Sequence, residues 1–249
     1  MKPSLEVNSE RDTCTFFAPA KDLKKPKYKK LDIFHDGWES IDLGNPPTGN
    51  EVVREVKTII SDIGNTTDKQ KQQYINCDLD TSYYIKQYMD EHDLEYDEDT
   101  LTHIEQNCRP IIKHFKNFYN RPRPYQVAEK LGLELNKFET DTSKTPAYPS
   151  GHATQATLVG EYYSKMYPQH RAGIMNGAKI CGYGRVIAGL HYPSDYDAGV
   201  KLGEELIDYV DLSLKEDAPV NSTGVGISMA PTALGKKKKK KKEYDIFKR

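Results

Sequence analysis

Residues 149–168 read PSGHATQATLVGEYYSKMYP, and this stretch indicates how the chain folds. A Pro-Ser-Gly turn opens it, and apolar residues then recur at helical spacing through Leu158, Val159, Tyr162, Tyr163 and Met166. Pro168 ends the run, because proline cannot continue a helix. The stretch therefore predicts a helix whose first turn carries free backbone N–H groups and a histidine.

The same reasoning, extended in both directions, predicts helices along most of the chain. Apolar residues follow a helical period in further segments: 51–64, about 68–89, about 101–120, 170–190 and about 193–212. We expect Asn50 to cap the first of these, and Asp99 or Thr100 the third. Pro110 predicts a kink or break inside the third. Strand signal is slight, so the predicted fold class is all-α, a helical bundle.

The two ends of the chain differ from its middle. Residues 1–30 are polar and basic, and we expect a basic N-terminal arm. Residues 213–249 contain an unbroken lysine run, Lys236–Lys242, and we expect a disordered tail. Residues 31–212 are left as one helical domain, in which the segment 31–43, with its single tryptophan, is expected to pack on the core.

Composition narrows the class of protein further. The N-terminus lacks the apolar run of a secretory signal, and no stretch approaches the ~18 apolar residues that span a bilayer. We therefore expect no membrane insertion, and a location in the cytoplasm or in a particle assembled there. Four cysteines lack CxxC spacing, which favours free thiols over a zinc site or a disulfide framework.

Three short segments, far apart in the chain, carry residue types that suit phosphoryl transfer. Their members, hereafter the eight-residue set, are Lys116, Arg123, Ser150, Gly151, His152, Arg185, His191 and Asp195. Cations and backbone N–H groups can hold non-bridging phosphate oxygens, one histidine can attack phosphorus, and another can protonate the leaving group. Asp195, four residues after His191, can fix the tautomer of that histidine.

Each segment alone also has an ordinary interpretation. Lysines and arginines at helix ends usually face solvent, and Ser150 suits a plain helix N-cap. The combination is far more specific, because it resembles the three-part motif of the type-2 phosphatidic acid phosphatase superfamily. That motif is Lys, six residues and Arg-Pro; then Pro-Ser-Gly-His; then Ser-Arg, five residues, His, three residues and Asp. The chain departs from it once, with Gly184 in place of the serine before Arg185.

The resemblance covers about residues 40–212 and is greatest to the bacterial class A non-specific acid phosphatases. It implies a fold of the acid phosphatase/vanadium haloperoxidase type and a hydrolase that needs neither metal nor cofactor. His191 would be the nucleophile, His152 the general acid and base, and Asp195 the residue that orients His191. The remaining members, Lys116, Arg123, Ser150, Gly151 and Arg185, would bind phosphate. Small, soluble phosphate monoesters are the expected substrates.

Two alternatives stay open on the sequence. The same cationic pocket suits vanadate, with His191 as its axial ligand, so a vanadate-dependent haloperoxidase is one of them. The other is a protein that binds an anionic surface or nucleic acid, with a degenerate phosphatase site and a weak polyanion contact through Lys236–Lys242. A homo-oligomer is also compatible with the sequence.

Overall fold

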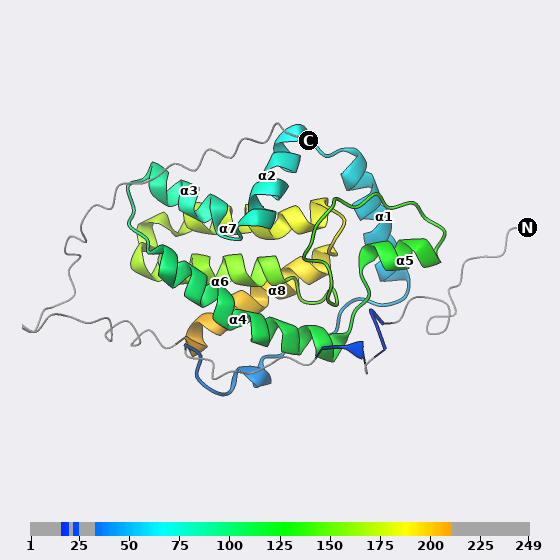
Figure 1. Ribbon diagram of the computed structural model, residues 1–249, viewed down its shortest axis with the longest axis horizontal. Coiled ribbons are helices and arrows are strands. Elements are labelled where there is room, and N and C mark those ends of the chain that lie inside the picture. Colours follow the sequence, from blue (N-terminus) through cyan, green and yellow to red (C-terminus); the bar gives the residue numbers. More distant parts are fainter. Residues whose placement is uncertain (1–15, 20–21, 25–32, 211–249) are drawn as a thin grey trace, which may run out of the picture. The chain divides into compact units, whose positions relative to one another are not determined.

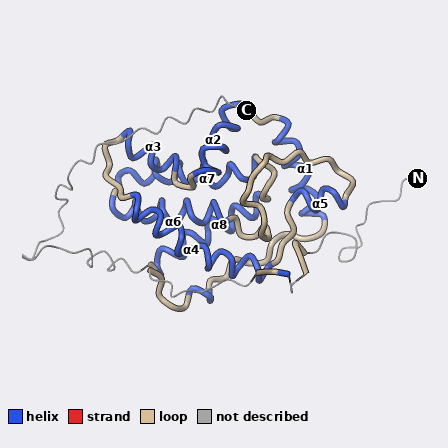
Figure 2. Tube along the Cα trace, viewed as in Figure 1, coloured by secondary structure: helices blue, strands red, loops and turns tan. Residues whose placement is uncertain are grey.

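The computed structural model describes residues 16–19, 22–24 and 33–210 (Figure 1). Within these residues the chain is helical, with one isolated bridge and no strand, which confirms the all-α prediction (Figure 2). The helices are α1 (Asn50–Gly64), α2 (Asp68–Leu79), α3 (Tyr83–Glu91), α4 (Glu98–Tyr119), α5 (Pro124–Lys130), α6 (Gly151–Met166), α7 (Arg171–Ile187) and α8 (Pro193–Leu206). Short 3-10 turns are η2 (Trp38–Ser40), η3 (Pro168–His170) and η4 (Ile207–Tyr209). No described helix is long and apolar enough to cross a membrane.

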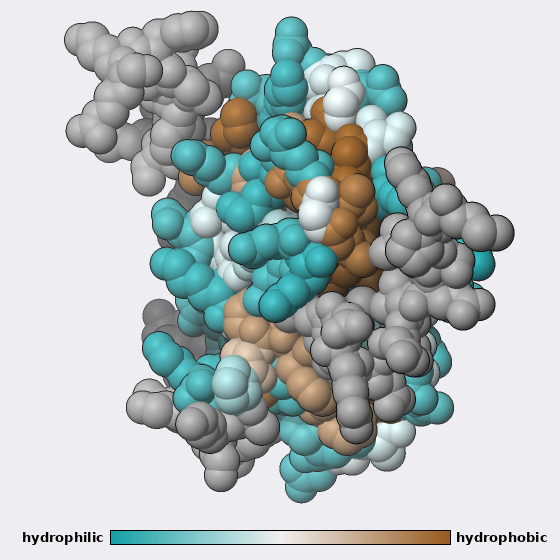
Figure 3. All heavy atoms as spheres, turned by 90° about the vertical axis from the view of Figure 1, so that its right-hand side faces the viewer, coloured by the Kyte–Doolittle hydropathy of each residue, from teal (hydrophilic) through white to brown (hydrophobic). Residues whose placement is uncertain are grey.

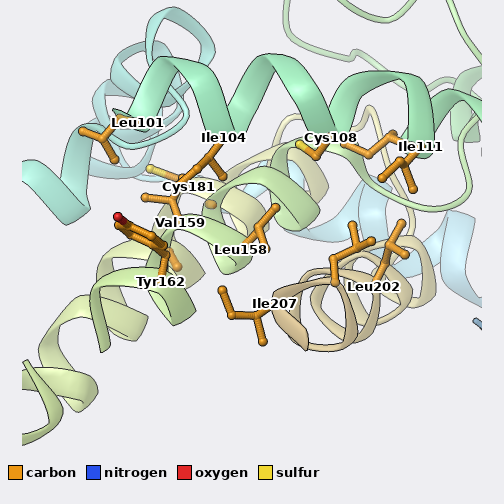
Figure 4. Close-up of a cluster of buried hydrophobic side chains, with 14 of the residues drawn as sticks. Leu101, Ile104, Cys108, Ile111, Leu158, Val159, Tyr162, Cys181, Leu202 and Ile207 are labelled. Atoms are coloured by element: carbon orange, nitrogen blue, oxygen red, sulfur yellow. The ribbon is translucent and has the colours of Figure 1, made fainter. Parts of the chain in front are cut away.

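Helix α6 is the centre of the fold. Its side chains from Ala153 to Ser164 are buried without interruption, as expected of a helix with neighbours on every side. It packs against α4, α7 and α8. Figure 4 shows Leu101, Ile104, Cys108 and Ile111 along α4 facing the side chains of α6, including Leu158 and Val159.

Close packing fixes the start of α6 against α8. A Cβ on Gly199 of α8 would lie only 2.6 Å from the carbonyl oxygen of Ser150, so a larger residue cannot replace this glycine without movement of backbone. The backbone N–H of Ser150 also donates to the carbonyl of Asp195, at 2.8 Å. The turn before α6 is thereby held beside the first turn of α8.

A second, smaller core lies under α1 and α5. It contains Val56 and Ile59 from α1, Val127 and Ala128 from α5, and Val186 from α7. On the face that carries α1 and α5, hydrophobic residues lie in a strip between hydrophilic ones (Figure 3). This second core places α1 next to the end of α7, where part of the eight-residue set lies.

The predicted single helix over 68–89 is wrong, because the chain breaks between α2 and α3. Asp80 has an extended backbone, with φ −150°, and its Oδ1 accepts from the N–H of Ser82 at 2.9 Å. An aspartate that bonds a backbone N–H two residues on offers the chain an alternative to helix. On either side of the break, α2 and α3 both pack on α7.

Several predicted helix ends also differ. Asn50 belongs to α1, whose N-cap is Gly49, and α4 is capped by Asp97, whose Oδ2 accepts from the N–H of Thr100 at 2.8 Å. Pro110 does not break α4, which is continuous from Glu98 to Tyr119. Helix α8 ends at Leu206 rather than near residue 212. Packing of the flanking apolar residues outweighs the local signal of Pro110.

The segment 33–43 packs on the core as predicted. Trp38 is 3% exposed, and its ring meets His114 and Phe115 of α4 edge-on. Most of the predicted arm and all of the predicted tail, Lys236–Lys242 included, lie outside the described residues. The boundaries of those regions, the oligomeric state and the cellular location stay predictions.

Candidate active site

The structure brings the three motif segments together at the N-terminal end of α6. Ser150 is the N-cap of α6, and its Oγ accepts from the N–H of Ala153 at 3.4 Å. Lys116, in the last turn of α4, reaches the same turn, since its Cε would lie 3.9 Å from a Cβ placed on Gly151. Ser150 is thus the helix cap of the ordinary interpretation and also lies where an anion would meet the helix N-terminus.

The tautomer of His191 follows from its two ring contacts. Nε2 lies 2.9 Å from Nη1 of Arg123, and Nδ1 lies 3.1 Å from Oδ2 of Asp195. A guanidinium only donates, so Nε2 must be the unprotonated nitrogen and Nδ1–H must donate to Asp195. The lone pair of Nε2 therefore points toward Arg123 and accepts a hydrogen bond from it, on the side where an anion held by that arginine would lie.

Asp195 is held by more partners than its motif indicates. It is fully buried, and Oδ2 also accepts from the N–H of Tyr192 at 2.9 Å. Oδ1 accepts from Nη1 of Arg121 at 2.6 Å, and Arg121 in turn donates to Oε2 of Glu55 at 2.8 Å. Glu55 also accepts from the N–H of Ser194 at 2.9 Å. Sequence reasoning missed both Arg121 and Glu55.

Arg123 and Lys116 are buried cations that hold backbone carbonyls. Arg123 donates to the carbonyl of Thr145 through Nε and to that of Leu190 through Nη1, both at 2.8 Å. Nζ of Lys116 donates to the carbonyls of Pro146 and Ala147, at 2.7 and 3.1 Å. Each cation therefore fixes the loop before α6 as well as supplying charge to the site.

Arg185 contacts a carboxylate that the sequence did not single out. Its Nη1 pairs with Oδ1 of Asp78, and its Nη2 donates to the hydroxyls of Thr142 and Thr140, at 2.8 and 3.2 Å. Nε2 of His152 lies 3.9 Å from the same Asp78 oxygen. The signal that could have found Asp78 is weak, because nothing in its local sequence separates it from a surface aspartate.

Burial and neighbouring cations lower the pKa values of several groups at this site. Burial lowers the pKa of His152 well below its ordinary value, and Arg185 and His191 add to the effect. Burial and then Arg123 lower the pKa of His191 in the same direction. The pKa of Lys116 is lowered by burial and by Arg123, and burial lowers that of Arg123 to about 10. Burial and the neighbouring cations thus favour the neutral forms of both histidines and of Lys116.

Gly184 leaves room where the motif has serine. A Cβ at this position would lie 3.8 Å from Cα of Tyr74, an ordinary contact distance. A Cβ at this position is therefore not excluded by packing. Among the described residues, no group of three or more His, Cys, Asp and Glu is arranged to hold a metal ion.

Comparison with known proteins is consistent with this geometry. Residues 108–207 match the model of the PAP2 superfamily. The chain is 34% identical over 88 residues to an acid phosphatase of Zymomonas mobilis, covering 35% of this chain and 33% of that protein. It is 30% identical over 125 residues to a non-specific acid phosphatase of Salmonella typhimurium, covering 42% of this chain and 50% of that protein. It is also 35% identical over 57 residues to a lipid A 1-phosphatase of Rhizobium etli, covering 23% of this chain and 25% of that protein.

These matches span a third to a half of the length of the two acid phosphatases. Among solved structures, the chain is similar to a transmembrane PAP2 type phosphatidylglycerolphosphate phosphatase from Bacillus subtilis, with 16% identity and a TM-score of 0.34 over 61% of this chain and 73% of that one. A score that low carries no argument about fold or function. The match to the PAP2 superfamily model, over residues 108–207, includes every member of the eight-residue set.

Proposed function

We propose that the protein is a metal-independent acid phosphatase that hydrolyses small phosphate monoesters through a phosphohistidine. One observation carries the proposal: Nε2 of His191 is unprotonated and lies 2.9 Å from Arg123, while Nδ1 is held by a buried carboxylate. A nucleophilic lone pair beside fixed cations suits attack on an anionic phosphoryl group. The acid phosphatases among the relatives support the choice of reaction.

The proposed reaction has two steps. In the first, the Nε2 lone pair of His191 forms a bond to phosphorus, the ester P–O bond breaks, and protonated His152 gives its proton to the leaving oxygen. In the second, His152 takes a proton from water, the water oxygen bonds to phosphorus, and the N–P bond breaks to release phosphate. Arg123, Arg185 and Lys116 hold the equatorial oxygens in both steps.

Substrate binding would change the contacts of the two arginines. Arg123 now donates to His191, and Arg185 is paired with Asp78. A phosphoryl group bound by both arginines would accept hydrogen bonds from N–H groups that now donate to His191 and Asp78. The cations of the site suit a dense anionic group, and we propose that the rest of a small ester contributes less to binding.

The test is hydrolysis of p-nitrophenyl phosphate by the full chain with EDTA present, beside the His191→Ala variant. We expect activity that survives EDTA and falls by at least about a thousandfold in the variant. Lys179→Ala, on an exposed part of α7, is the matched control and should keep wild-type activity. A parallel assay with a lipid phosphate in detergent micelles separates monoester from lipid substrates. Equal rates for wild type and His191→Ala would refute the proposal.

A further inference from the structure

Asp78 lies where the phosphoryl group of the proposed function would bind. Every contact that the structure gives its side chain uses Oδ1: the ion pair with Arg185, the hydroxyls of Thr140 at 3.1 Å and Thr142 at 3.5 Å, and the approach of His152 at 3.9 Å. Arg185 and His152 are also the groups that would hold and protonate the substrate. Asp78 therefore lies beside the same two groups, Arg185 and His152, that an incoming phosphate would need.

The burial pattern places Asp78 at the accessible edge of the site. The side chains of Arg185, His191 and Asp195 are 2%, 4% and 0% exposed, whereas those of Asp78 and His152 are 21% and 13% exposed. Asp78 and Arg185 are paired, so a phosphoryl group that binds Arg185 would have an oxygen near the carboxylate of Asp78.

An ionised carboxylate can only accept hydrogen bonds. A phosphate oxygen that carries a proton can donate to it, whereas an oxygen without one meets it as a like charge, which costs binding free energy. A monoester has a second pKa of about 6, so near that pH it exists in both forms. Sulfate has the same tetrahedral shape but remains a dianion, with no proton to donate.

We propose that Asp78 is a specificity-determining residue that admits the protonated, monoanionic form of phosphate and rejects fully ionised tetrahedral anions. The proposal rests on the proposed function, because it assigns the phosphoryl site to the same pocket. In its simplest alternative, Asp78 only holds Arg185 in place. The two roles predict opposite effects when the charge is removed.

The experiment measures equilibrium binding of inorganic phosphate and of sulfate to the full chain by calorimetry, at a single pH of about 5.5, where phosphate is largely the monoanion. One pH is used because His152 of α6, whose Nε2 lies 3.9 Å from Oδ1 of Asp78, changes its charge with pH. Asp78→Asn keeps an oxygen for Arg185 but removes the charge. Asp141→Asn, an exposed carboxylate between the two threonines, controls for a general change of charge.

The wild type and Asp141→Asn should prefer phosphate to sulfate. In Asp78→Asn we expect sulfate to bind at least about tenfold more tightly, which corresponds to about 1.4 kcal/mol. The preference for phosphate should fall by a similar factor. Asp78→Ser removes the charge with a smaller side chain and should lower the preference too, so the test does not depend on the folding of one variant.

The proposal would be overturned if the sulfate affinity of both variants is unchanged, or if it falls together with their phosphate affinity. Either result would favour a supporting role for Asp78. A wild type that binds both anions equally would also overturn it. Binding is measured without turnover, so the two claims can fail separately. A chain that selects phosphate through Asp78 and hydrolyses no ester would refute the proposed function and leave this inference standing.

Discussion

At the scale of single residues, the site is defined by which atoms donate and which accept. Arg123 can only donate, and this fixes His191 with Nδ1–H on Asp195 and a lone pair on Nε2. The motif spacing could predict that His191 and Asp195 meet. It could not predict that Arg123 would contact Nε2 of His191, because that contact depends on how the chain after α4 lies against the turn before α8.

The pH dependence of activity follows from the lowered histidine pKa values. His191 must be neutral to attack, so activity is lost as pH falls through its pKa, and His152 must be protonated to donate, so activity is lost as pH rises through its pKa. Burial lowers both below the ordinary value of 6.5. We expect kcat/KM, measured from about pH 3.5 to 9, to peak below about pH 6.5. A peak above about pH 7.5 would contradict these roles.

Gly184→Ser should raise activity. The packing leaves room for the added Cβ, and the hydroxyl would restore a donor present in the motif that the chain resembles. We expect kcat/KM to rise by up to about tenfold, because a positioned donor stabilises charge in the transition state. Steady-state kinetics with p-nitrophenyl phosphate measures this.

Gly177→Ser is the contrasting variant on the same helix. A Cβ there would lie 2.7 Å from the backbone of Tyr84, so we expect a loss of stability and no gain in activity. A Gly184→Ser protein that folds normally but is less active than wild type would show that the glycine is required.

At the scale of elements, α1 and the loop after α4 hold Asp195 through a buried ion network. Arg121 connects Glu55 of α1 to Asp195 of α8, and its guanidinium lies 3.9 Å from the ring centre of Tyr192. Such networks are costly to break, because the partner is left as an unpaired buried charge.

Arg121→Met should therefore destabilise the protein by about 3–5 kcal/mol, measured by urea unfolding. Arg109→Met, on an exposed position of α4, is the control and should change stability by less than about 0.5 kcal/mol. An Arg121→Met protein as stable as the control would show that Asp195 is not dependent on this partner. Its kcat would then be expected to remain unchanged as well.

The contact between α2 and α7 includes two buried thiols. Sγ of Cys77 lies 2.8 Å from Sγ of Cys181, and this hydrogen bond, together with burial, raises the pKa of Cys77. Burial also raises the pKa of Cys108. Protonated, buried thiols react slowly. In native protein we expect iodoacetamide to leave these three cysteines unmodified, as read by peptide mass spectrometry, and to modify all of them in urea. Rapid labelling of native Cys77 would contradict this packing.

Prediction from sequence succeeded for elements whose signal is local. Helices α4, α6 and α7 follow from apolar periodicity, and α6 begins where its Pro-Ser-Gly turn indicates and ends before Pro168. The break at Asp80 depends on one side-chain bond, and the continuity through Pro110 depends on packing, so neither is visible in the periodicity. The contacts of Asp78 and Glu55 were missed for the same reason, since both are long-range.

At the scale of the whole molecule, the buried histidines link stability to pH. His152 and His191 have lowered pKa values in the folded protein and about 6.5 when unfolded. Between those values the unfolded chain binds more protons, so stability is fully present above about pH 6.5 and falls as pH is lowered toward the folded pKa values. We expect the melting temperature to fall between about pH 6.5 and 5, and less steeply in His191→Gln. An identical slope in the variant would contradict the assignment.

The central claim is that a phosphoryl group is transferred to Nε2 of His191, and trapping it is the most direct test. In His152→Ala, p-nitrophenolate can leave without an acid, whereas water lacks its base, so a phosphoenzyme should accumulate. After rapid base quenching and digestion, we predict one phosphoryl group on the peptide that contains His191, and none in the double variant His152→Ala/His191→Ala. Turnover by His152→Ala with no phosphopeptide, or with the phosphoryl group on another residue, would contradict the account.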